Sequence, residues 1–214
     1  MNVADIKSRV RRTFGDESAV QVTDADLFKW ISDAQLEIIR QNEGLLQSSA
    51  LASSVVGQMD YPLSVITDLF TVKTVLYNSI KLKGLTLQQF EEYLDGWQNT
   101  QLYGNGTPQV YMVYNNVLSL FPPPDTATAN VIKIYYSKKP TSITSDSDPL
   151  TLPEVYHPTI VKYCLIQAYE MDEDWNAFNA KSQQFVNDVN TLRDNEELNQ
   201  RIYYPAITLL PEDC

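Results

Sequence analysis

The sequence predicts an α+β protein in which N- and C-terminal helices form an antiparallel helical bundle around an inserted β-rich region of hairpins. Two observations predict this class. Apolar residues recur every three or four positions over residues 3–43 and 154–195, the spacing of one helix face. Between those segments the period shortens toward two, and Gly, Asn and Pro residues divide the chain into short β-prone runs.

The bulk composition limits the class of protein. A chain of 214 residues with 43% apolar and 20% charged residues can bury a core, and we expect one compact body with an appendage. No apolar run approaches the roughly 20 residues of a membrane helix. The first residues lack the apolar core of a secretory signal, so we expect no membrane contact and a chain that stays in the cytoplasm where it is made. With only Cys164 and Cys214, a disulfide framework is excluded.

The charge argues against a protein that grips nucleic acid. Sixteen basic against 27 acidic residues give a net charge of −11, which opposes tight binding to phosphates. Four basic residues nevertheless lie within six positions near the N-terminus: Lys7, Arg9, Arg11 and Arg12. They form either a solvated helix face or a local contact with an acidic partner or nucleic acid.

The first elements are two helices. Residues 3–13 are predicted to form a short amphipathic helix, which Gly15 ends. Thr23 is a favourable N-cap for a second helix over residues 24–43, because its hydroxyl can accept a hydrogen bond from a first-turn amide.

The middle of the chain reads as strands. Residues 48–85 hold two β-prone segments, each interrupted by turn residues, at 57–58 and at 78–79, and we predict hairpins there. Thr86 then caps a short helix predicted over residues 86–97.

The segment GTPQVYMVYNNVLSLFPPP, residues 106–124, is predicted to be a compact hairpin. Asn115 and Asn116 tolerate the positive φ of a two-residue turn, and the prolines at 122–124 end the return strand because they cannot donate to a ladder. A further strand follows over residues 130–136.

Tyrosine is the other notable feature of this hairpin. The chain has 13 tyrosines, a residue enriched at protein interfaces. Both faces of the hairpin are apolar, so both must be covered. Tyr111, Tyr114 and Phe121 are therefore candidates for either the β core or an inter-subunit or tail-facing contact.

The helical period returns after residue 153. Residues 154–171 are apolar on all sides, which predicts a helix that is central or contacts a neighbouring chain. The next helix, with Asp174 as its cap, carries a stripe alternating three and four residues, namely Trp175, Phe178, Ser182, Phe185, Val189 and Leu192. Such a stripe packs along a partner helix, so the two helices should form a hairpin.

The predicted organisation therefore has three parts. Residues 1–47 and 149–197 form the helical bundle domain, and residues 48–148 form the β-rich insertion. Residues 198–214 form an extended tail, which is apolar and aromatic but broken by two prolines.

Groups able to catalyse a reaction are scarce. The single histidine, His157, is predicted in the first turn of a helix, and Cys164 lies roughly 10 Å further along its axis, so the two cannot act as a pair. Cys164 is interpreted as a core residue. The acidic groups at 146–148 and 172–174 lack the spacing of a calcium loop. The sequence predicts no catalytic residue, no metal site and no cofactor.

Six motifs, taken in order, resemble the head-to-tail adaptors (head completion or neck connector proteins) of tailed double-stranded DNA bacteriophages. The resemblance spans roughly residues 3–195. It consists of an N-terminal helix, the capped helix TDADLFKWISDAQLEIIR, the YPLS turn, the GTPQVYMVYNNVLSLFPPP hairpin, the strand IKIYYSKKP, and LPEVYHPTIVKYCLIQAYEMDED opening the last helical pair.

The resemblance implies a structural virion protein and not an enzyme. Copies would form a ring beneath the dodecameric portal, extend the DNA channel and present a surface to neck, nozzle or tail proteins. Genomic DNA would pass through without tight binding, and assembly would take place in the host cytoplasm. The C-terminal tail would dock into the portal protein through Ile202, Tyr203, Tyr204, Pro205, Ile207, Leu209 and Leu210.

Two other classes of function remain open from the sequence. One is a virion-associated cell-wall hydrolase that uses carboxylates, since many Asp and Glu residues are present. The other is a small regulatory or nucleic-acid-binding protein, which the net charge disfavours.

Overall fold

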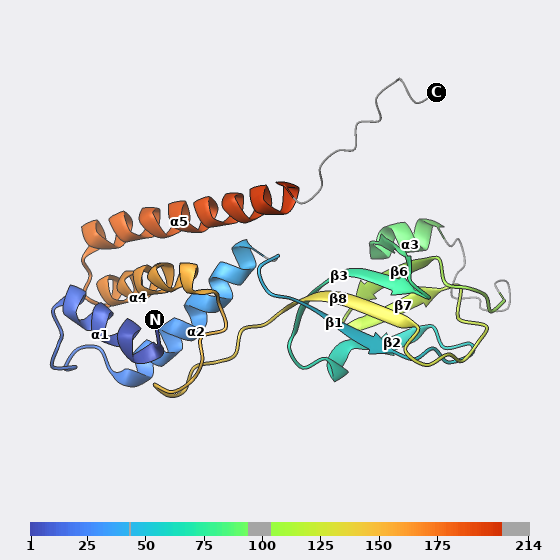
Figure 1. The fold of residues 1–214 in the computed structure, drawn as a ribbon, viewed down its shortest axis with the longest axis horizontal. Helices are drawn as coiled ribbons and strands as arrows, with labels where there is room; N and C mark the ends of the chain where they lie inside the picture. The colour runs from blue at the N-terminus through green and yellow to red at the C-terminus, as the bar shows by residue number, and fades with distance from the viewer. Residues whose placement is uncertain (43, 94–103, 203–214) are drawn as a thin grey trace, which may run out of the picture. The chain divides into compact units, whose positions relative to one another are not determined.

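The computed structural model describes residues 1–42, 44–93 and 104–202 and confirms the α+β class, with 43% helix and 23% strand. The chain divides into two compact units (Figure 1). Residues 1–42 and 140–214 form the helical unit, and residues 43–139 form the strand-rich unit. Residues 140–148, predicted to close the insertion, belong to the helical unit because their backbone and side chains bond to it; the amide of Ile143, for example, donates to the Ser32 hydroxyl at 2.8 Å.

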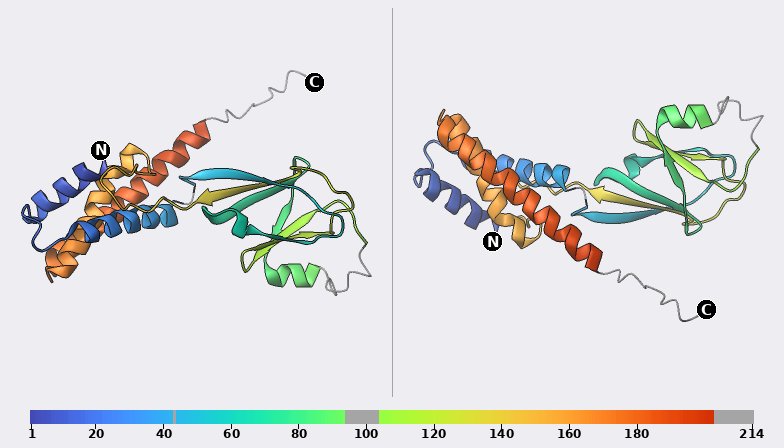
Figure 2. Two further views of the ribbon diagram at one scale, coloured as in Figure 1. Left: turned by 90° about the horizontal axis from the view of Figure 1, so that it is seen from below. Right: turned by 90° about the horizontal axis from the view of Figure 1, so that it is seen from above.

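The helical unit is built around one central helix. Helices α1 (Val3–Phe14), α2 (Asp24–Gln41) and α5 (Trp175–Ile202) all pack against α4 (His157–Met171), as Figure 2 shows from two sides. The buried residues of α4 lie around its circumference: His157, Thr159, Ile160, Val161, Cys164, Leu165, Ile166 and Ala168. The apolar pattern on all sides of this segment is therefore that of a central helix, which other helices of the same chain cover.

The helix ends follow the capping signals of the sequence. Thr23 accepts from the amide of Asp26, whose carboxylate accepts from the amide of Thr23, so the predicted N-cap is a complete capping box. Gly15 ends α1 with φ 91°, a left-handed conformation that glycine adopts at little cost. Asp174 accepts from the amide of Ala177 and caps α5 as predicted.

Helix α5 departs from its predicted stripe and end. Phe185 and Val189 are buried against α4, but Trp175 in the first turn is 57% exposed. Trp175 is the first residue of the stripe and lies beyond the end of α4. No helix in the described part of the chain therefore covers its side chain. The helix also runs to Ile202, into residues predicted as extended tail, because the polar run before Pro205 contains good helix formers and no breaker.

The strand-rich unit holds two four-stranded sheets (Figure 1). The first has the order β1 (Gln47–Ala52), β8 (Ile132–Lys138), β3 (Leu69–Tyr77), β4 (Ile80–Lys81). The second has the order β2 (Asp60–Pro62), β7 (Val117–Phe121), β6 (Val110–Tyr114), β5 (Lys83–Leu85), and only its β5–β6 pair is parallel. Both sheets contribute to one buried cluster that includes Val75, Leu118, Leu120, Ile132 and Ile134.

One predicted hairpin in this unit is confirmed and one is wrong. β3 and β4 pair across Asn78 and Ser79, whose φ values are 48° and 66°. The segments on either side of residues 57–58 do not pair with each other, since β1 pairs with β8 and β2 pairs with β7. The chain crosses there from one sheet to the other: Tyr61 of β2 is buried in the shared core, and Ala52 of β1, which is partly buried, packs against it. Such long-range pairing leaves no local signal in the sequence.

The short helix α3 spans Leu87–Tyr93. Its predicted cap is present, because Thr86 accepts from the amide of Gln89 at 3.3 Å. The rest of the helix predicted to residue 97 lies outside the described residues.

Candidate functional site

The predicted hairpin at 106–124 is present as β6 and β7. Its register places Tyr114 opposite Val117, and Asn115 and Asn116 between them have φ values of 47° and 60°, the geometry of a tight two-residue turn. The prolines follow directly after β7, as predicted. The sequence therefore defines a rigid element whose tip is set by two asparagines.

Most of this hairpin is covered from inside the unit. Tyr111 packs against the cluster between the sheets, and its burial raises the pKa of its hydroxyl. Phe121 is 8% exposed and meets Phe90 of α3 edge-on, with 6.2 Å between ring centroids. Tyr114, by contrast, is 60% exposed. Of the three candidates, only Tyr114 has a mostly exposed side chain that a partner could contact.

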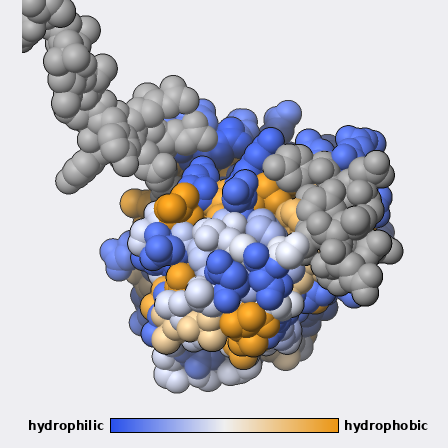
Figure 3. Space-filling model, turned by 90° about the vertical axis from the view of Figure 1, so that its right-hand side faces the viewer, coloured by the Kyte–Doolittle hydropathy of each residue, from blue (hydrophilic) through white to orange (hydrophobic). Residues whose placement is uncertain are grey.

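Further apolar side chains are exposed around the hairpin tip. Val113 is 40% exposed, and the turn accepts a hydrogen bond from the amide of Leu63 to the Asn116 carbonyl at 2.9 Å. This bond holds the short helix η1 (Leu63–Val65) beside the turn, and Val65 is 79% exposed. Viewed from another end, the strand-rich unit shows separate apolar patches among polar side chains (Figure 3). At the hairpin tip, the exposed apolar side chains are those of Val65, Val113 and Tyr114.

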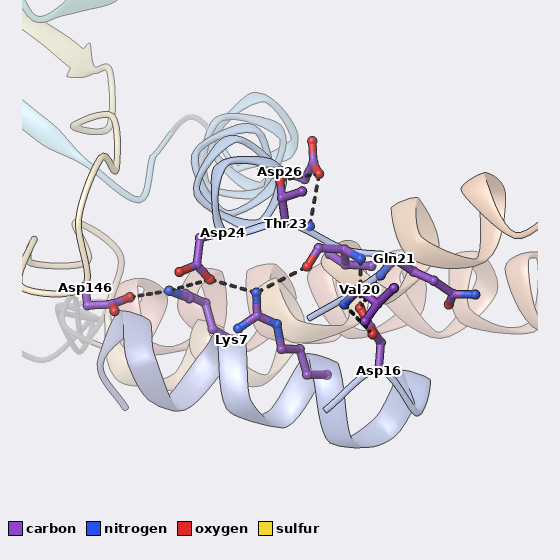
Figure 4. Close-up of polar contacts among 10 residues, drawn as sticks. Lys7, Asp16, Val20, Gln21, Thr23, Asp24, Asp26 and Asp146 are labelled. Atoms are coloured by element: carbon purple, nitrogen blue, oxygen red, sulfur yellow. Dashed lines mark hydrogen bonds and ion pairs between the residues drawn. The ribbon is translucent and has the colours of Figure 1, made fainter. Parts of the chain in front are cut away.

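A cluster of charges connects α1, α2 and the loop before α4 (Figure 4). Lys7 Nζ donates to the carboxylates of Asp24 and Asp146 at 2.8 Å each, although the Lys7 side chain is only 6% exposed. Arg11 donates to the same Asp24 carboxylate at 2.7 Å. Burial lowers the pKa of Lys7, but its bonds to Asp146 and Asp24 outweigh that effect and raise it. Lys7 is therefore held as a cation, and the hydrogen bonds from Lys7 and Arg11 lower the pKa of Asp24.

Two further carboxylates organise turns of the same unit. Asp16 accepts from the amides of Val22, Val20 and Gln21 at 2.8 to 3.0 Å, and these bonds lower its pKa. Asp148 accepts from Thr144 and Ser145, which lowers its pKa to about 2. These carboxylates satisfy backbone donors that would otherwise lack partners in the loops.

The basic run near the N-terminus thus has two parts. Lys7 and Arg11 meet an acidic partner, and that partner is the chain itself. Arg9 and Arg12 are exposed and make no ion pair with any other residue that the structure describes. Nothing in the sequence pointed to the pairing of Lys7 with Asp24 and Asp146, which lie far from it in the chain.

The residues considered for catalysis lie in the core. His157 begins α4, as predicted, and its Nε2 lies 3.0 Å from the carbonyl of Leu152 in a buried setting. Cys164 is fully buried, and burial raises the pKa of its thiol. A buried thiol of high pKa is a poor nucleophile.

The described residues form neither a metal-binding cluster nor a membrane-spanning helix. Within 1–42, 44–93 and 104–202, no three His, Cys, Asp or Glu side chains gather so that they could hold a metal ion. No helix in the same ranges is long and apolar enough to cross a membrane.

The comparison with protein families decides the class of the chain. The family model described as SU10 adaptor protein matches residues 1–207. The chain belongs to this family. SU10 adaptor proteins are phage head-to-tail adaptors, so the resemblance read from the six motifs is confirmed. No curated protein matches the chain.

Membership makes the chain a structural adaptor of the phage virion that acts with portal and tail components at the neck. The predicted docking residues of the adaptor lie almost wholly beyond the described part of the chain. Ile202 is the last residue of α5, and the other six fall within residues 203–214.

Proposed function

We propose that the adaptor assembles as several copies into a ring beneath the portal and extends the DNA channel toward the tail. In this proposal it has no catalytic step, and genomic DNA passes through without tight binding. The family resemblance supports a dodecameric ring. Assembly of the ring takes place in the host cytoplasm.

The distribution of charge is the observation that best supports a channel. The helical unit contains ten basic and twenty acidic residues, whereas the strand-rich unit contains six and seven. An acidic wall repels the phosphate backbone at short range, which lets DNA move past without being captured. The resemblance to phage head-to-tail adaptors implies that the helical bundle builds the ring wall, and the acidic excess of the helical unit agrees with this assignment.

The strand-rich unit then supplies the surface for neck or tail proteins. Tyr114 at the hairpin tip is 60% exposed and is the contact residue that we propose there. Tyr111 and Phe121 support the tip from the core. A rigid tip with an exposed aromatic residue provides contact area at low cost in conformational entropy.

The tail is proposed to dock into the portal protein. Its residues 202–210 combine aromatic and aliphatic side chains with two nearby prolines, at 205 and 211, that oppose a regular helix. Docking through such a segment adds apolar contact area without moving the folded units.

Co-expression with the portal protein tests this function. Purified complexes of the full chain should contain multiple adaptor copies per portal by native mass spectrometry. A chain ending at Ile202, which keeps all of α5, should fold but fail to copurify with the portal. A Tyr114→Ser chain serves as the matched control and should copurify normally. Failure of the full chain to bind the portal would refute the proposal, and normal binding of the shortened chain would refute the role of the tail.

A further inference from the structure

Strand β1 forms an open edge of its sheet. It pairs only with β8 in the order β1-β8-β3-β4, so among the described residues its other side has no neighbouring strand (Figure 1). An unpaired edge presents a row of amides and carbonyls that another extended segment can bond. We call the outward side of residues 47–52 the β1 edge.

The backbone groups of the β1 edge follow from the register. The amide of Lys138 donates to the Leu46 carbonyl at 2.8 Å, one step before the first pair of the β1–β8 ladder. Bonded pairs alternate along an antiparallel ladder, so residues 48, 50 and 52 bond to β8. Gln47, Ser49 and Leu51 therefore direct their amides and carbonyls away from β8, where no described residue bonds them.

The other sheet edges are protected, and the β1 edge is not. Strand β4 has two residues, and β2 and β5 have three each. They carry charges or a proline, namely Asp60 and Pro62 in β2, Lys81 in β4 and Lys83 in β5.

Strand β1 has six residues without charge, proline or bulge, and no charged residue occurs anywhere in residues 44–59. Short strands, charges and prolines keep sheet edges from pairing with other chains. Their absence at β1 indicates an edge that another chain covers.

The side chains beside this edge are apolar where they are large. Leu51 is 57% exposed, and Val55 and Val56 just beyond β1 are exposed as well. A strand added beside β1 brings its side chains to about 5 Å from those of β1 on the same face. The residue that lies beside Leu51 is therefore apolar.

We propose that an extended segment of a neck or tail protein adds to the β1 edge as a further strand of the sheet. The segment is uncharged beside Leu51 and about five residues long or more, the length that pairs with most of β1. The inference rests on the proposed function, in which the strand-rich unit contacts these proteins. It names the surface and the kind of segment that meet there.

The symmetry of a ring argues for a separate protein as the source of the strand. Copies in a ring of more than two meet through two different surfaces, so β1 of one copy does not pair with β1 of the next. The other edges that the structure describes have only two or three residues, too few to match the six of β1.

Photocross-linking in phage particles tests the added strand. An adaptor with a photoreactive phenylalanine analogue at position 51 should cross-link to a neck or tail protein. Ser49→Pro removes an outward amide and places the proline ring where the partner strand would bond. This change should lower the cross-link yield at least about tenfold. Ser49→Thr keeps the amide, is the matched control and should cross-link normally.

The fold of the proline variant is checked separately. The Ser49 amide bonds nothing in the described part of the chain, so Ser49→Pro should shift the thermal midpoint of the isolated adaptor by less than about 3 °C. Ser48→Pro removes a bond to β8 and should lower the midpoint further.

The outcomes separate strand addition from the proposed function. Particles that contain the adaptor but give no cross-link from position 51, or one only to the portal or to another adaptor copy, would overturn strand addition while the ring stands. Equal cross-linking by Ser49→Pro and Ser49→Thr would overturn it too. Unaltered particles that lack the adaptor would overturn both proposals.

Hydrogen exchange of the unaltered chain provides a second test. The amides of Gln47, Ser49 and Leu51 should exchange rapidly in the isolated adaptor and at least about tenfold more slowly in phage particles. The amides of residues 48, 50 and 52, which bond to β8, are the internal control and should be protected in both. Equal exchange of the three outward amides in the two states would contradict the added strand.

Discussion

The two units of the adaptor differ in how their loops are held. In the helical unit, charged groups do this: Lys7 joins Asp24 to Asp146, and Asp16 and Asp148 satisfy the amides of two turns. In the strand-rich unit a neutral hydroxyl does the same, since Ser54 donates to the Thr126 carbonyl at 2.7 Å and accepts from the Thr128 amide at 3.0 Å. The acidic unit therefore depends on ionisation for its shape, and the nearly neutral unit depends mainly on packing.

The largest expected effect comes from removing core side chains in one unit at a time. Ile38 in α2 and Leu118 in β7 are both fully buried. Ile38→Ala and Leu118→Ala should each lower the free energy of unfolding by about 2–5 kcal/mol through lost burial and a residual cavity. Hydrogen exchange with mass spectrometry should show the loss of protection within the altered unit. Equal loss across both units in either variant would show that they unfold as one body.

The ion cluster should be the next most sensitive feature. Lys7→Met keeps the stem of the side chain but leaves the carboxylates of Asp24 and Asp146 without this cation, so we expect a cost of about 1–3 kcal/mol. Chemical denaturation measures it. Lys29→Met, on an exposed position of α2, is the matched control and should cost less than about 0.5 kcal/mol. A similar loss of unfolding free energy in both variants would show that the ion cluster does not stabilise the fold.

Low pH should destabilise the helical unit more than the strand-rich unit, and this effect should be smaller than those of the substitutions above. Asp24, Asp16 and Asp148 have lowered pKa values in the folded helical unit, so they bind fewer protons folded than unfolded. Their stabilisation is complete above the unfolded pKa of about 3.9 and is lost as the pH falls through the folded values, to about 2 for Asp148.

Hydrogen exchange between pH 5 and pH 2 tests this difference. The helical unit should lose more stability than the strand-rich unit, in whose described part Asp68 has such a lowered pKa through its bonds from Tyr136 and Lys138, which outweigh burial. Asp148→Asn should reduce the pH dependence of the helical unit. The opposite order of the two units would contradict the comparison.

The smallest effect concerns the hairpin turn. Asn116 has φ 60°, where glycine fits without strain and a β-branched residue does not. Asn116→Gly should change the free energy of unfolding by less than about 0.5 kcal/mol, and Asn116→Val should cost about 1–2 kcal/mol. Thermal unfolding of the strand-rich unit measures both, and equal behaviour of the two variants would show that the turn is not constrained.

Local features of this fold could be read from the sequence, and distant partners could not. Thr23 and Asp26 form a capping box within one turn, and Asn115 with Asn116 sets a turn from two residues. The pairing of β1 with β8 and the bond from Lys7 to Asp146 join residues far apart in the chain, where no spacing rule applies. Such contacts are decided by the tertiary fold.

The site shows the same limit. The exposure of Tyr114 and the burial of Phe121 depend on α3 covering one side of the hairpin, which a single strand pattern does not reveal. The sequence pattern places Trp175 in a buried stripe. Its side chain is exposed because it lies at the corner between α4 and α5, which the pattern does not reveal. The family, by contrast, was recognisable from the order of six weak motifs.

Electron cryomicroscopy of the phage neck tests the central claim most directly. The account predicts a ring of adaptor copies next to the portal, with the acidic helical units around the channel and the strand-rich units toward the tail. An adaptor ring whose channel is lined by the strand-rich units, or a neck without adaptor copies, would contradict it.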